Sequence, residues 1–282
     1  MFQFRMLLSQ VKSAIIGIAV IIAFWEGAAY YLKGMTPYAH IILPTIEQCL
    51  TEAIPGMAPF FWGGQGGLFQ GQAGANLYLI GLLALAQNSA ITVLRIISGL
   101  VWGAIVGIGT GIMMGMNDKV RKFLEPPIEL IRTIPLLTLI PLFMYWFGIS
   151  EIGRFLYIVY GVAVVLVINT INAIDNVPPV YKQFSLTMGA SRGQVFRTVV
   201  LPAIVPGLAG GLKFTLALSW ALTLAAEYLN ALSGLGRIVI LSEIHLFTDR
   251  MIVVVVLLII YSLVLYAAFM RFYRFVTRWM PS

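Results

Sequence analysis

Charge is scarce in this 282-residue chain. Charged residues make up only 10% of it, whereas hydrophobic residues make up 60% and the mean hydropathy is +0.93. A water-soluble domain of this length cannot bury so many apolar side chains in its core. The composition therefore excludes a soluble globular protein and indicates an all-α polytopic membrane protein, because the apolar runs do not alternate as barrel strands would.

Cysteine and histidine are nearly absent, which removes several kinds of site. The single cysteine, Cys49, cannot form an internal disulfide. The two histidines, His40 and His245, lie outside the apolar runs and have no clustered ligands. Neither an H-E-x-x-H nor a Walker A sequence occurs. We therefore expect no metal site, no catalytic residues and no nucleotide site on this chain, and we do not expect it to be an enzyme.

Six apolar runs are long enough to cross a bilayer, which needs about 20 mostly apolar residues. The expected spans are residues 11–32, 91–116, 128–147, 154–174, 203–229 and 251–272. The first span is expected to be an uncleaved helix rather than a signal peptide, because it is long and five more follow. We accordingly divide the chain into an N-terminal membrane helix (1–32), an external segment (33–90) and a core bundle (91–282).

The basic residues are distributed unevenly between the two sides of the membrane. With the N-terminus inside, eleven are cytoplasmic: Arg5, Lys12, Lys119, Arg121, Lys122, Lys182, Arg192, Arg197, Arg271, Arg274 and Arg278. Four are external: Lys33, Arg154, Arg237 and Arg250. This bias predicts a multi-pass protein of the bacterial inner (plasma) membrane with both termini cytoplasmic. It also accounts for the net charge of +7 without nucleic-acid binding.

The external segment is the least regular part of the chain. Leu43-Pro44-Thr45 is expected to start a short helix through Ala53, and 55–75, rich in glycine, glutamine and aromatic residues, is expected to be a loop. The apolar run 77–86 is too short to span, so we expect it to lie along the outer interface or against neighbouring helices.

Small residues and prolines mark particular spans. Glycines recur every four residues in the second span, at positions 99, 103, 107, 111 and 115, and let helix backbones approach closely. Because the stripe drifts around a straight helix, it can serve more than one neighbour, either within the subunit or at a dimer seam. Prolines in the third and fifth spans predict bends, which suit either a moving protein or simple kinks. These prolines are Pro126, Pro127, Pro135, Pro141, Pro202 and Pro206.

A polar interruption at 175–202 separates two apolar spans. Asp175 and Asn176 are expected to cap a short helix, along which Val180, Phe184 and Met188 form one apolar stripe. Gly189 is expected to end this helix. Ser191 and Gln194 have the spacing of a capping box, which predicts a second helix start. The interruption is therefore predicted to be two helices that meet at a glycine elbow, facing water and a partner.

This interruption resembles the cytoplasmic loop signature of binding-protein-dependent ABC import permeases, E-A-A, three residues, G, nine residues, I, one residue, L-P. Gly189-Ala190-Ser191, Val199 and Leu201-Pro202 reproduce its spacing. Gln183-Phe184-Ser185 stands where the family has Glu-Ala-Ala, and Val199 replaces the isoleucine. The missing glutamate removes any salt bridge that it makes in relatives, but the docking helix remains.

The resemblance extends from about Leu43 to the last span and is closest to the nitrate, sulfonate, taurine and bicarbonate permeases. The segments that carry it are 89–99 (SAITVLRIISG), 127–141 (PIELIRTIPLLTLIP), 146–149 (WFGI), 226–228 (AEY) and 233–236 (SGLG). The glycine-rich stretch 55–75 looks like an insertion. The resemblance implies the type I importer permease fold, with two permease subunits enclosing one pathway.

The resemblance also implies partners. Cytoplasmic ABC ATPase subunits would hold ATP and Mg and would receive the coupling helix, an external solute-binding protein would deliver substrate, and a second permease subunit would complete a dimer, expected to be a homodimer. The expected ATPase-coupling residues are Tyr181, Lys182, Gln183, Phe184, Ser185, Met188, Gly189, Ala190, Ser191 and Arg192. No cofactor is expected on the permease itself.

Three ionisable residues are candidates for the pathway or its gate: Lys213, Glu227 and Arg132. Lys213 lies about ten residues, or roughly 15 Å, into the fifth span, close to the midplane. It has no acidic residue one turn away, so it pairs across helices or lines a wet pathway. Glu227 precedes the SGLG turn and is either part of an outer gate or merely interfacial. The resemblance points to a small anion such as nitrate, bicarbonate or a sulfonate as the substrate.

A secondary transporter or a channel independent of an ATPase is the alternative. Secondary transporters usually show internal repeats with paired broken helices, and here the elbow occurs once. A Walker A sequence in a neighbouring reading frame would favour the ABC permease.

Overall fold

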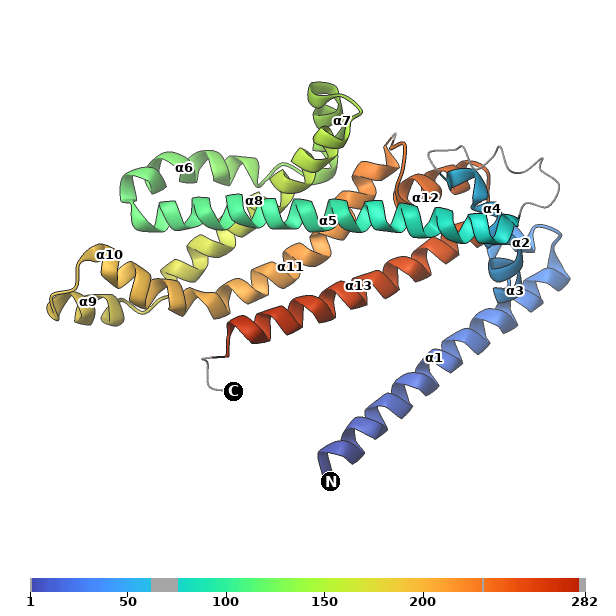
Figure 1. Cartoon of the computed structure of the whole chain (residues 1–282), viewed down its shortest axis with the longest axis horizontal. Helices are drawn as coiled ribbons and strands as arrows, with labels where there is room; N and C mark the ends of the chain where they lie inside the picture. Colours follow the sequence, from blue (N-terminus) through green and yellow to red (C-terminus); the bar gives the residue numbers. More distant parts are fainter. Residues whose placement is uncertain (1, 62–75, 230, 279–282) are drawn as a thin grey trace. The chain divides into compact units, whose positions relative to one another are not determined.

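The computed structural model describes residues 2–61, 76–229 and 231–278, and every regular element in these ranges is a helix (Figure 1). Contacts divide the chain into two units. The first comprises Met1–Gln87 with Ile238–Leu257, and the second comprises Asn88–Arg237 with Leu258–Ser282. Most of the glycine-rich stretch expected to be a loop, positions 62–75, lies outside the described residues.

The first unit contains a long helix and several short ones. They are α1 (Phe2–Met35), α2 (Ala39–Ile42), α3 (Ile46–Gln48), the π-helical turn η1 (Cys49–Ala53), α4 (Ile54–Gly56) and most of α12 (Leu235–Ile244). Thr45 and Gln48 form a capping box, which confirms the predicted helix start. The helical path continues through the π turn to Gly56, three residues beyond the predicted end.

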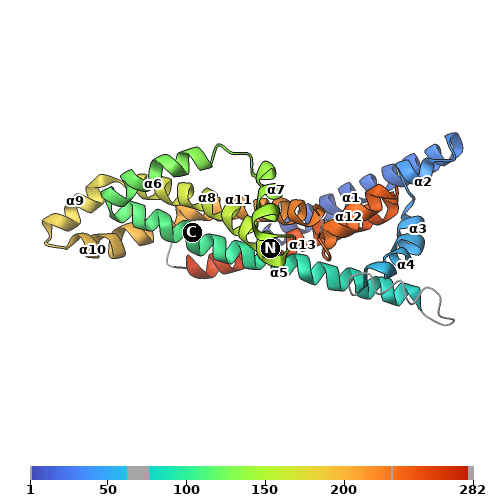
Figure 2. The same ribbon diagram turned by 90° about the horizontal axis from the view of Figure 1, so that it is seen from above.

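The second unit contains the long helices of the bundle. They are α6 (Asp118–Ile131), α7 (Leu136–Phe147), α8 (Glu151–Asp175), α9 (Pro179–Thr187), α10 (Arg192–Val195), the π turn η3 (Phe196–Val200) and α11 (Leu201–Tyr228). Two further helices, α5 (Leu77–Met116) and α13 (Thr248–Val276), run through both units. The core forms where α8 packs against α7 and α11, around Tyr157, Val162 and Leu166 (Figure 2).

The glycine stripe of α5 packs against α8. A Cβ at Gly103 would lie 2.6 Å from side-chain atoms of Val162, and one at Gly107 would lie 2.6 Å from the carbonyl oxygen of Ala163. Gly99, Gly111 and Gly115 likewise face residues of α8. All five glycines therefore serve one neighbour within the subunit, and the expectation of several neighbours is wrong. Every fourth residue forms a ridge inclined to the helix axis, and a helix crossing along that ridge meets each glycine in turn.

Five helices of the described residues are long and apolar enough to cross a membrane, or six if one bent pair counts as a span. The spans expected at 154–174, 203–229 and 251–272 correspond to α8, α11 and α13. The run 77–86 is the first part of α5 rather than a separate segment. Of its two expected positions, the structure shows the one against neighbouring helices, because Gly81 lies against the backbone of Ile54 and Ala84 and Leu85 are buried. Polar residues around Asn88 lower the local hydropathy but do not end the helix.

The third expected span, 128–147, is broken. It includes the end of α6 and all of α7, which meet at a bend of 100°, as the prolines of this span predict, and the two helices form one span only if the bent pair is counted together. Pro135 precedes α7, and its ring disfavours the helical conformation for Ile134, so the helix cannot continue through this point. Pro126 and Pro127, by contrast, remain inside α6.

Candidate functional site

The apolar stripe of α9 is exposed. Phe184 is 65% exposed and Met188 74%, and Val180 and Tyr181 on the same side are also exposed. Large apolar side chains that gather on an exposed helix face mark a surface that a partner covers. The predicted apolar stripe is therefore present and exposed on the second unit, with Gln183 and Ser185 beside it.

The elbow after α9 is fixed by local hydrogen bonds. Gly189 has φ +85°, the left-handed conformation that ends helices, and the N–H of Ala190 donates to the carbonyl of Ser185 at 3.1 Å. The Ser191 Oγ accepts from the N–H of Gln194 at 3.3 Å, while the Gln194 side chain accepts from the N–H of Ser191 at 2.8 Å. These contacts confirm the predicted glycine stop and the predicted capping box. Arg192, the first residue of α10, is exposed.

The predicted cap of α9 is wrong. Pro178 occupies the N-cap without a side-chain hydrogen bond, because Asp175 and Asn176 instead end α8. Asp175 accepts two hydrogen bonds of 2.8 Å from the guanidinium of Arg121 on α6. Lys182 donates to the carbonyl of Ile174 at 3.3 Å, so α9 is attached to the end of α8.

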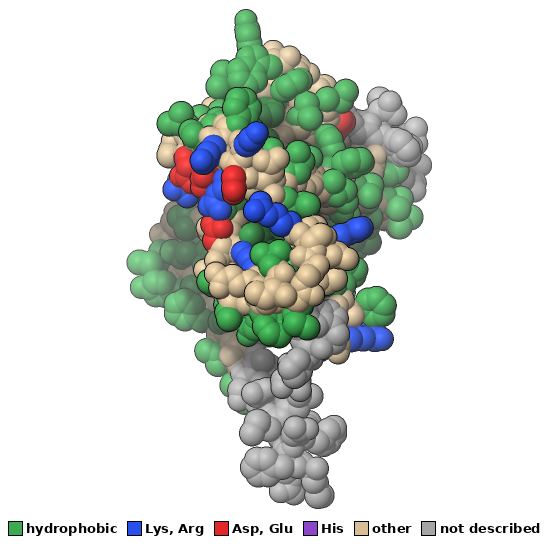
Figure 3. Space-filling view, turned by 90° about the vertical axis from the view of Figure 1, so that its left-hand side faces the viewer, with side chains coloured by type: hydrophobic (Ala, Val, Ile, Leu, Met, Phe, Trp, Pro, Cys, Tyr) green, Lys and Arg blue, Asp and Glu red, His purple; other side chains and the backbone are tan. Residues whose placement is uncertain are grey.

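The elbow is anchored to two membrane helices. Phe196 and Val200 of η3 are buried in an apolar cluster with Ile174 of α8 and with Ile204 and Leu208 of α11. The elbow is therefore fixed to the end of α8 and to the start of α11. Figure 3 views the end that carries α9 and α10, and basic side chains gather there with a few acidic ones.

Gly189 to Gly193 also has the order G-x-S-x-G, which in α/β-hydrolases marks a nucleophile elbow. That elbow requires a strand before the serine and an exposed Oγ. Here a helix, α9, precedes the sequence, and the Ser191 Oγ caps α10. The serine is a helix cap.

Glu227 lies in a buried polar cluster at the other end of the second unit's bundle. Its side chain is fully buried, so the interfacial alternative is wrong. Its carboxylate accepts from the Thr92 hydroxyl at 2.9 Å, from Arg95 Nη1 at 2.7 Å and from the Gly236 N–H at 2.9 Å. The end of α11 is thereby joined to α5 and to the SGLG turn.

Arg95 is the centre of this cluster, which we call the clamp. Besides Glu227, it contacts both carboxylate oxygens of Glu151 on α8, at 2.8 and 2.6 Å, and the carbonyl and hydroxyl of Ser233, at 2.8 and 3.1 Å. A guanidinium has five N–H donors, and these five bonds can occupy all of them. Arg154, on α8, donates to Glu151 at 2.9 Å, so two positive and two negative side chains meet.

The turn at 233–236 is held by one face of α5. The N–H groups of Gly234 and Leu235 donate to the side chains of Asn88 at 2.7 Å and Thr92 at 2.9 Å. Gly234 has φ +110°, and a Cβ there would overlap the Glu227 carboxylate. Glycine is therefore required both by the backbone conformation and by the space available.

Sequence reasoning missed Arg95, Glu151 and Arg154 as members of this site. A signal for Arg95 was available, because a charged residue inside an apolar run needs a buried partner. A second signal is the spacing of three polar residues, Asn88, Thr92 and Arg95, which places them on one face of a helix.

The other two candidate residues lie outside the clamp. Arg132 follows α6 and pairs with Glu129 at 2.6 Å, both side chains being about half exposed. The Nζ of Lys213, on α11, is 5.9 Å from the ring centroid of Tyr273 on α13. Among the described residues, no carboxylate forms an ion pair with Lys213.

Comparison with protein families gives one match over most of the bundle. Residues 99–281 match the family described as a binding-protein-dependent transport system inner membrane component. The taurine transport system permease protein TauC of Escherichia coli K12 is 30% identical over 270 residues, which are 96% of this chain and 90% of TauC. The nitrate import permease protein NrtB of Leptolyngbya laminosa is 32% identical over 142 residues, 50% of this chain and 51% of NrtB.

A solved structure has the same fold. A chain of the MetNI methionine ABC transporter, in an inward-facing conformation, superposes with a TM-score of 0.57 and 22% identity, covering 69% of this chain and 96% of that chain. At this identity the likeness establishes the fold alone. The predicted all-α importer permease fold is confirmed.

Proposed function

Because the chain belongs to the family of binding-protein-dependent transport system inner membrane components, we propose that it forms the substrate pathway of an importer powered by a separate ATPase. The observation that carries this proposal is the exposed apolar face of α9 on an elbow anchored to α8 and α11. The face has the size and chemistry of a helix that inserts into a groove of a partner.

In this proposal the ATPase subunits are cytoplasmic and hold ATP and Mg. They contact Phe184 and Met188 through a groove, with Tyr181, Lys182 and Gly189 to Arg192 at its edges. Closure of the ATPases on ATP displaces α9, and the buried contacts of Phe196 and Val200 pass this displacement to α8 and α11. Hydrolysis reverses the movement, so the pathway opens alternately to each side. An external solute-binding protein supplies substrate, and a second permease subunit, most simply another copy of this chain, completes the pathway.

Phe184→Asp tests this docking. We expect the charge to prevent burial of the apolar face, so that the co-expressed ATPase no longer co-purifies and ATP-coupled uptake is lost. Leu186→Asp is the matched control, since Leu186 is also exposed but lies on the opposite side of α9. Pull-down from detergent and uptake into proteoliposomes measure both steps. Normal coupled uptake by the Phe184 variant, with the ATPase retained, would remove α9 as the coupling element.

We further propose that the substrate is a small anion sensed by Lys213. The charge supports this assignment, because an ammonium deep in a membrane helix without a paired carboxylate requires water or an anion. The names of two relatives support this substrate class, because taurine carries a sulfonate group and nitrate is itself a small anion. The aromatic ring of Tyr273 lies beside the ammonium of Lys213. The ammonium keeps N–H donors for an oxyanion.

Lys213→Met tests the substrate class. We expect selective loss of sulfonate or nitrate uptake while the permease still assembles with its ATPase, because the variant keeps most of the length of the side chain and removes its charge. Lys213→Arg keeps the charge and is expected to retain uptake in part. If Lys213→Met fails to assemble while Lys213→Arg assembles normally, the lysine is structural and the pathway assignment is wrong.

A further inference from the structure

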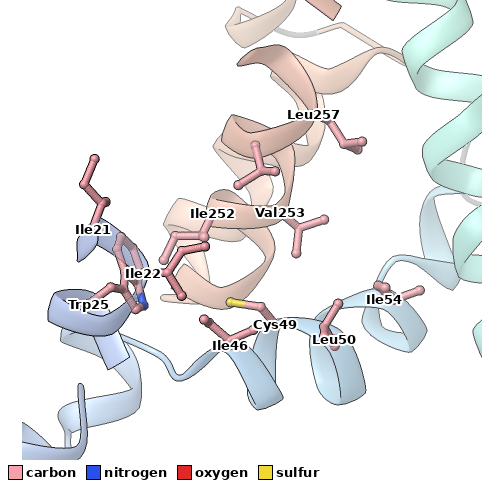
Figure 4. A pocket seen from close by; sticks show the side chains of 11 residues that line it. Ile21, Ile22, Trp25, Ile46, Cys49, Leu50, Ile54, Ile252, Val253 and Leu257 are labelled. Atoms are coloured by element: carbon pink, nitrogen blue, oxygen red, sulfur yellow. The ribbon is translucent and has the colours of Figure 1, made fainter. Parts of the chain in front are cut away.

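An apolar cavity of about 380 Å³ lies within the first unit (Figure 4). Its walls come from α1, from the segment α3 to α4, and from the first turns of α13. The side chains that line it include Ile21 and Trp25, Leu50, and Val253 and Leu257. Cavities with purely apolar walls stay dry and bind hydrocarbon. Its volume falls in the range of roughly 300–1,000 Å³ typical of small-ligand sites.

Two of the three walls are candidate membrane spans. Residues 16–35 of α1 and the helix α13 are apolar. In each of them, only 6% of the most apolar stretch of 18 residues is buried in the protein. These helices therefore face lipid in the membrane, and the hydrocarbon available to this cavity is an acyl chain.

A polar pocket of about 310 Å³ uses two of the same walls. On the α3 to η1 segment, Leu50 lines the apolar cavity, whereas Glu52 lines the polar pocket. On α13, Val253 lines the apolar cavity, whereas Asp249 and Arg250 line the polar pocket. His40 and His245 complete its ionisable groups. The lining thus changes from hydrocarbon to charge within one or two turns of each wall.

Arg250 lines this pocket and, in the part of the chain that the structure describes, forms no salt bridge with a carboxylate. Among the described residues, its Nε is buried and has no hydrogen-bond partner, and its guanidinium lies 3.8 Å from the ring centroid of Phe247. A Cβ at Gly56 would lie 2.6–2.8 Å from the guanidinium, so only glycine leaves room for it. A guanidinium that forms no salt bridge with the nearby carboxylates has an N–H donor available for a phosphate, and the carboxylates can then receive a cation.

We propose that the two pockets hold one phospholipid whose headgroup carries both a phosphate and a primary ammonium. Its acyl chain fills the apolar cavity and its phosphate contacts Arg250. Its ammonium donates to Glu52 and Asp249. An anionic headgroup would leave these two carboxylates beside a negative charge, and a quaternary ammonium would give them no hydrogen-bond donor.

Native mass spectrometry of the full chain, with its ATPase partner, tests the assignment. The probe is detergent supplemented with equal amounts of phosphatidylethanolamine, phosphatidylcholine and phosphatidylglycerol. We expect phosphatidylethanolamine to be retained about tenfold over the other two, the difference of one charge-assisted hydrogen bond. Equal retention of the three lipids, or preference for phosphatidylglycerol, would overturn the proposal.

Variants in the wall of the apolar cavity and in the polar pocket locate the site. Val253→Trp fills the apolar cavity and is expected to lose the bound lipid, whereas Val255→Trp, an exposed position two residues away that does not line the cavity, is expected to keep it. Leu50→Trp fills the cavity from another wall and must give the same loss, which separates occupancy from a folding defect in one variant. Glu52→Gln is expected to reduce the preference for phosphatidylethanolamine, because it removes a carboxylate that receives the ammonium, whereas Arg250→Gln is expected to weaken retention of all three lipids, because they share the phosphate. Unchanged lipid retention by both filling variants would overturn the site.

Discussion

At the scale of single residues, the clamp around Arg95 is the most constrained part of the second unit. Its charges are balanced only when all four ionisable side chains are present, and Glu227 is fully buried. Removing one partner leaves an uncompensated buried charge, whose cost exceeds the net value of the ion pair itself. The clamp thus makes the ends of α5, α8 and α11 depend on one another.

Glu227→Gln is expected to lower the free energy of unfolding by about 3 kcal/mol, because Arg95 loses a buried carboxylate. Glu125→Gln is the control, since Glu125 pairs with Arg121 in a partly exposed position and is expected to cost at most about 1 kcal/mol. Denaturant titration in detergent measures both. If Glu227 also belongs to the outer gate, Glu227→Gln changes the basal ATPase activity at normal expression. Unchanged activity together with unchanged stability would contradict both the gate role and the stabilising role of Glu227.

At the scale of elements, the contact between α5 and α8 depends on the absence of side chains. At Gly107 a methyl group would meet backbone atoms of Ala163, which cannot rotate away as a flexible side chain can. The cost of a larger residue there is a displacement of one helix from the other, because well-packed interiors have no spare volume.

Gly107→Ala is therefore expected to destabilise the permease by roughly 1–3 kcal/mol. Gly109→Ala is the matched control, because a Cβ at Gly109 has no atom within 4 Å, and alanine there favours the helix. Thermal unfolding followed by intrinsic fluorescence distinguishes them. Equal stability of the two variants would show that the contact between α5 and α8 tolerates a larger distance between the two helices.

How far these elements can be predicted depends on the sequence distance of their contacts. Gly189, Ser191 and Gln194 were predictable, because the elbow is fixed by hydrogen bonds that span three to five residues. The clamp was not, because Arg95 and Glu227 are 132 residues apart and either could have paired elsewhere. The continuity of α5 through Asn88 was missed for a related reason, since hydropathy does not reveal that a polar side chain has a distant partner.

At the scale of the whole molecule, the distribution of basic residues predicts the orientation in the membrane. The basic residues of α6, α9 and α10 lie at the end with the elbow, and the clamp lies at the other end of the second unit's bundle. The positive-inside rule then assigns the elbow to the cytoplasm and the clamp to the outside.

Site-directed labelling tests this orientation in a Cys49→Ser background. In the unmodified chain, burial raises the pKa of the Cys49 thiol to about 11. Because the thiolate is the reactive form, Cys49 itself is labelled slowly until the pH approaches that value, and the serine removes this background. A membrane-impermeant maleimide is expected to label Ile149→Cys in intact cells and Asp118→Cys only after the membrane is opened; both native side chains are exposed. The reverse pattern would invert the topology.

The clamp also sets an order of events during synthesis. Arg95 is made 56 residues before Glu151 and 132 residues before Glu227. At about 5–20 residues per second, the second carboxylate arrives roughly 7–26 s after the arginine. During that interval α5 carries a guanidinium into the membrane before its charge is balanced, and α8 supplies the first carboxylate. The clamp can therefore be completed only after the ribosome has passed α11 and the SGLG turn that follows it, which makes its assembly sequential rather than simultaneous.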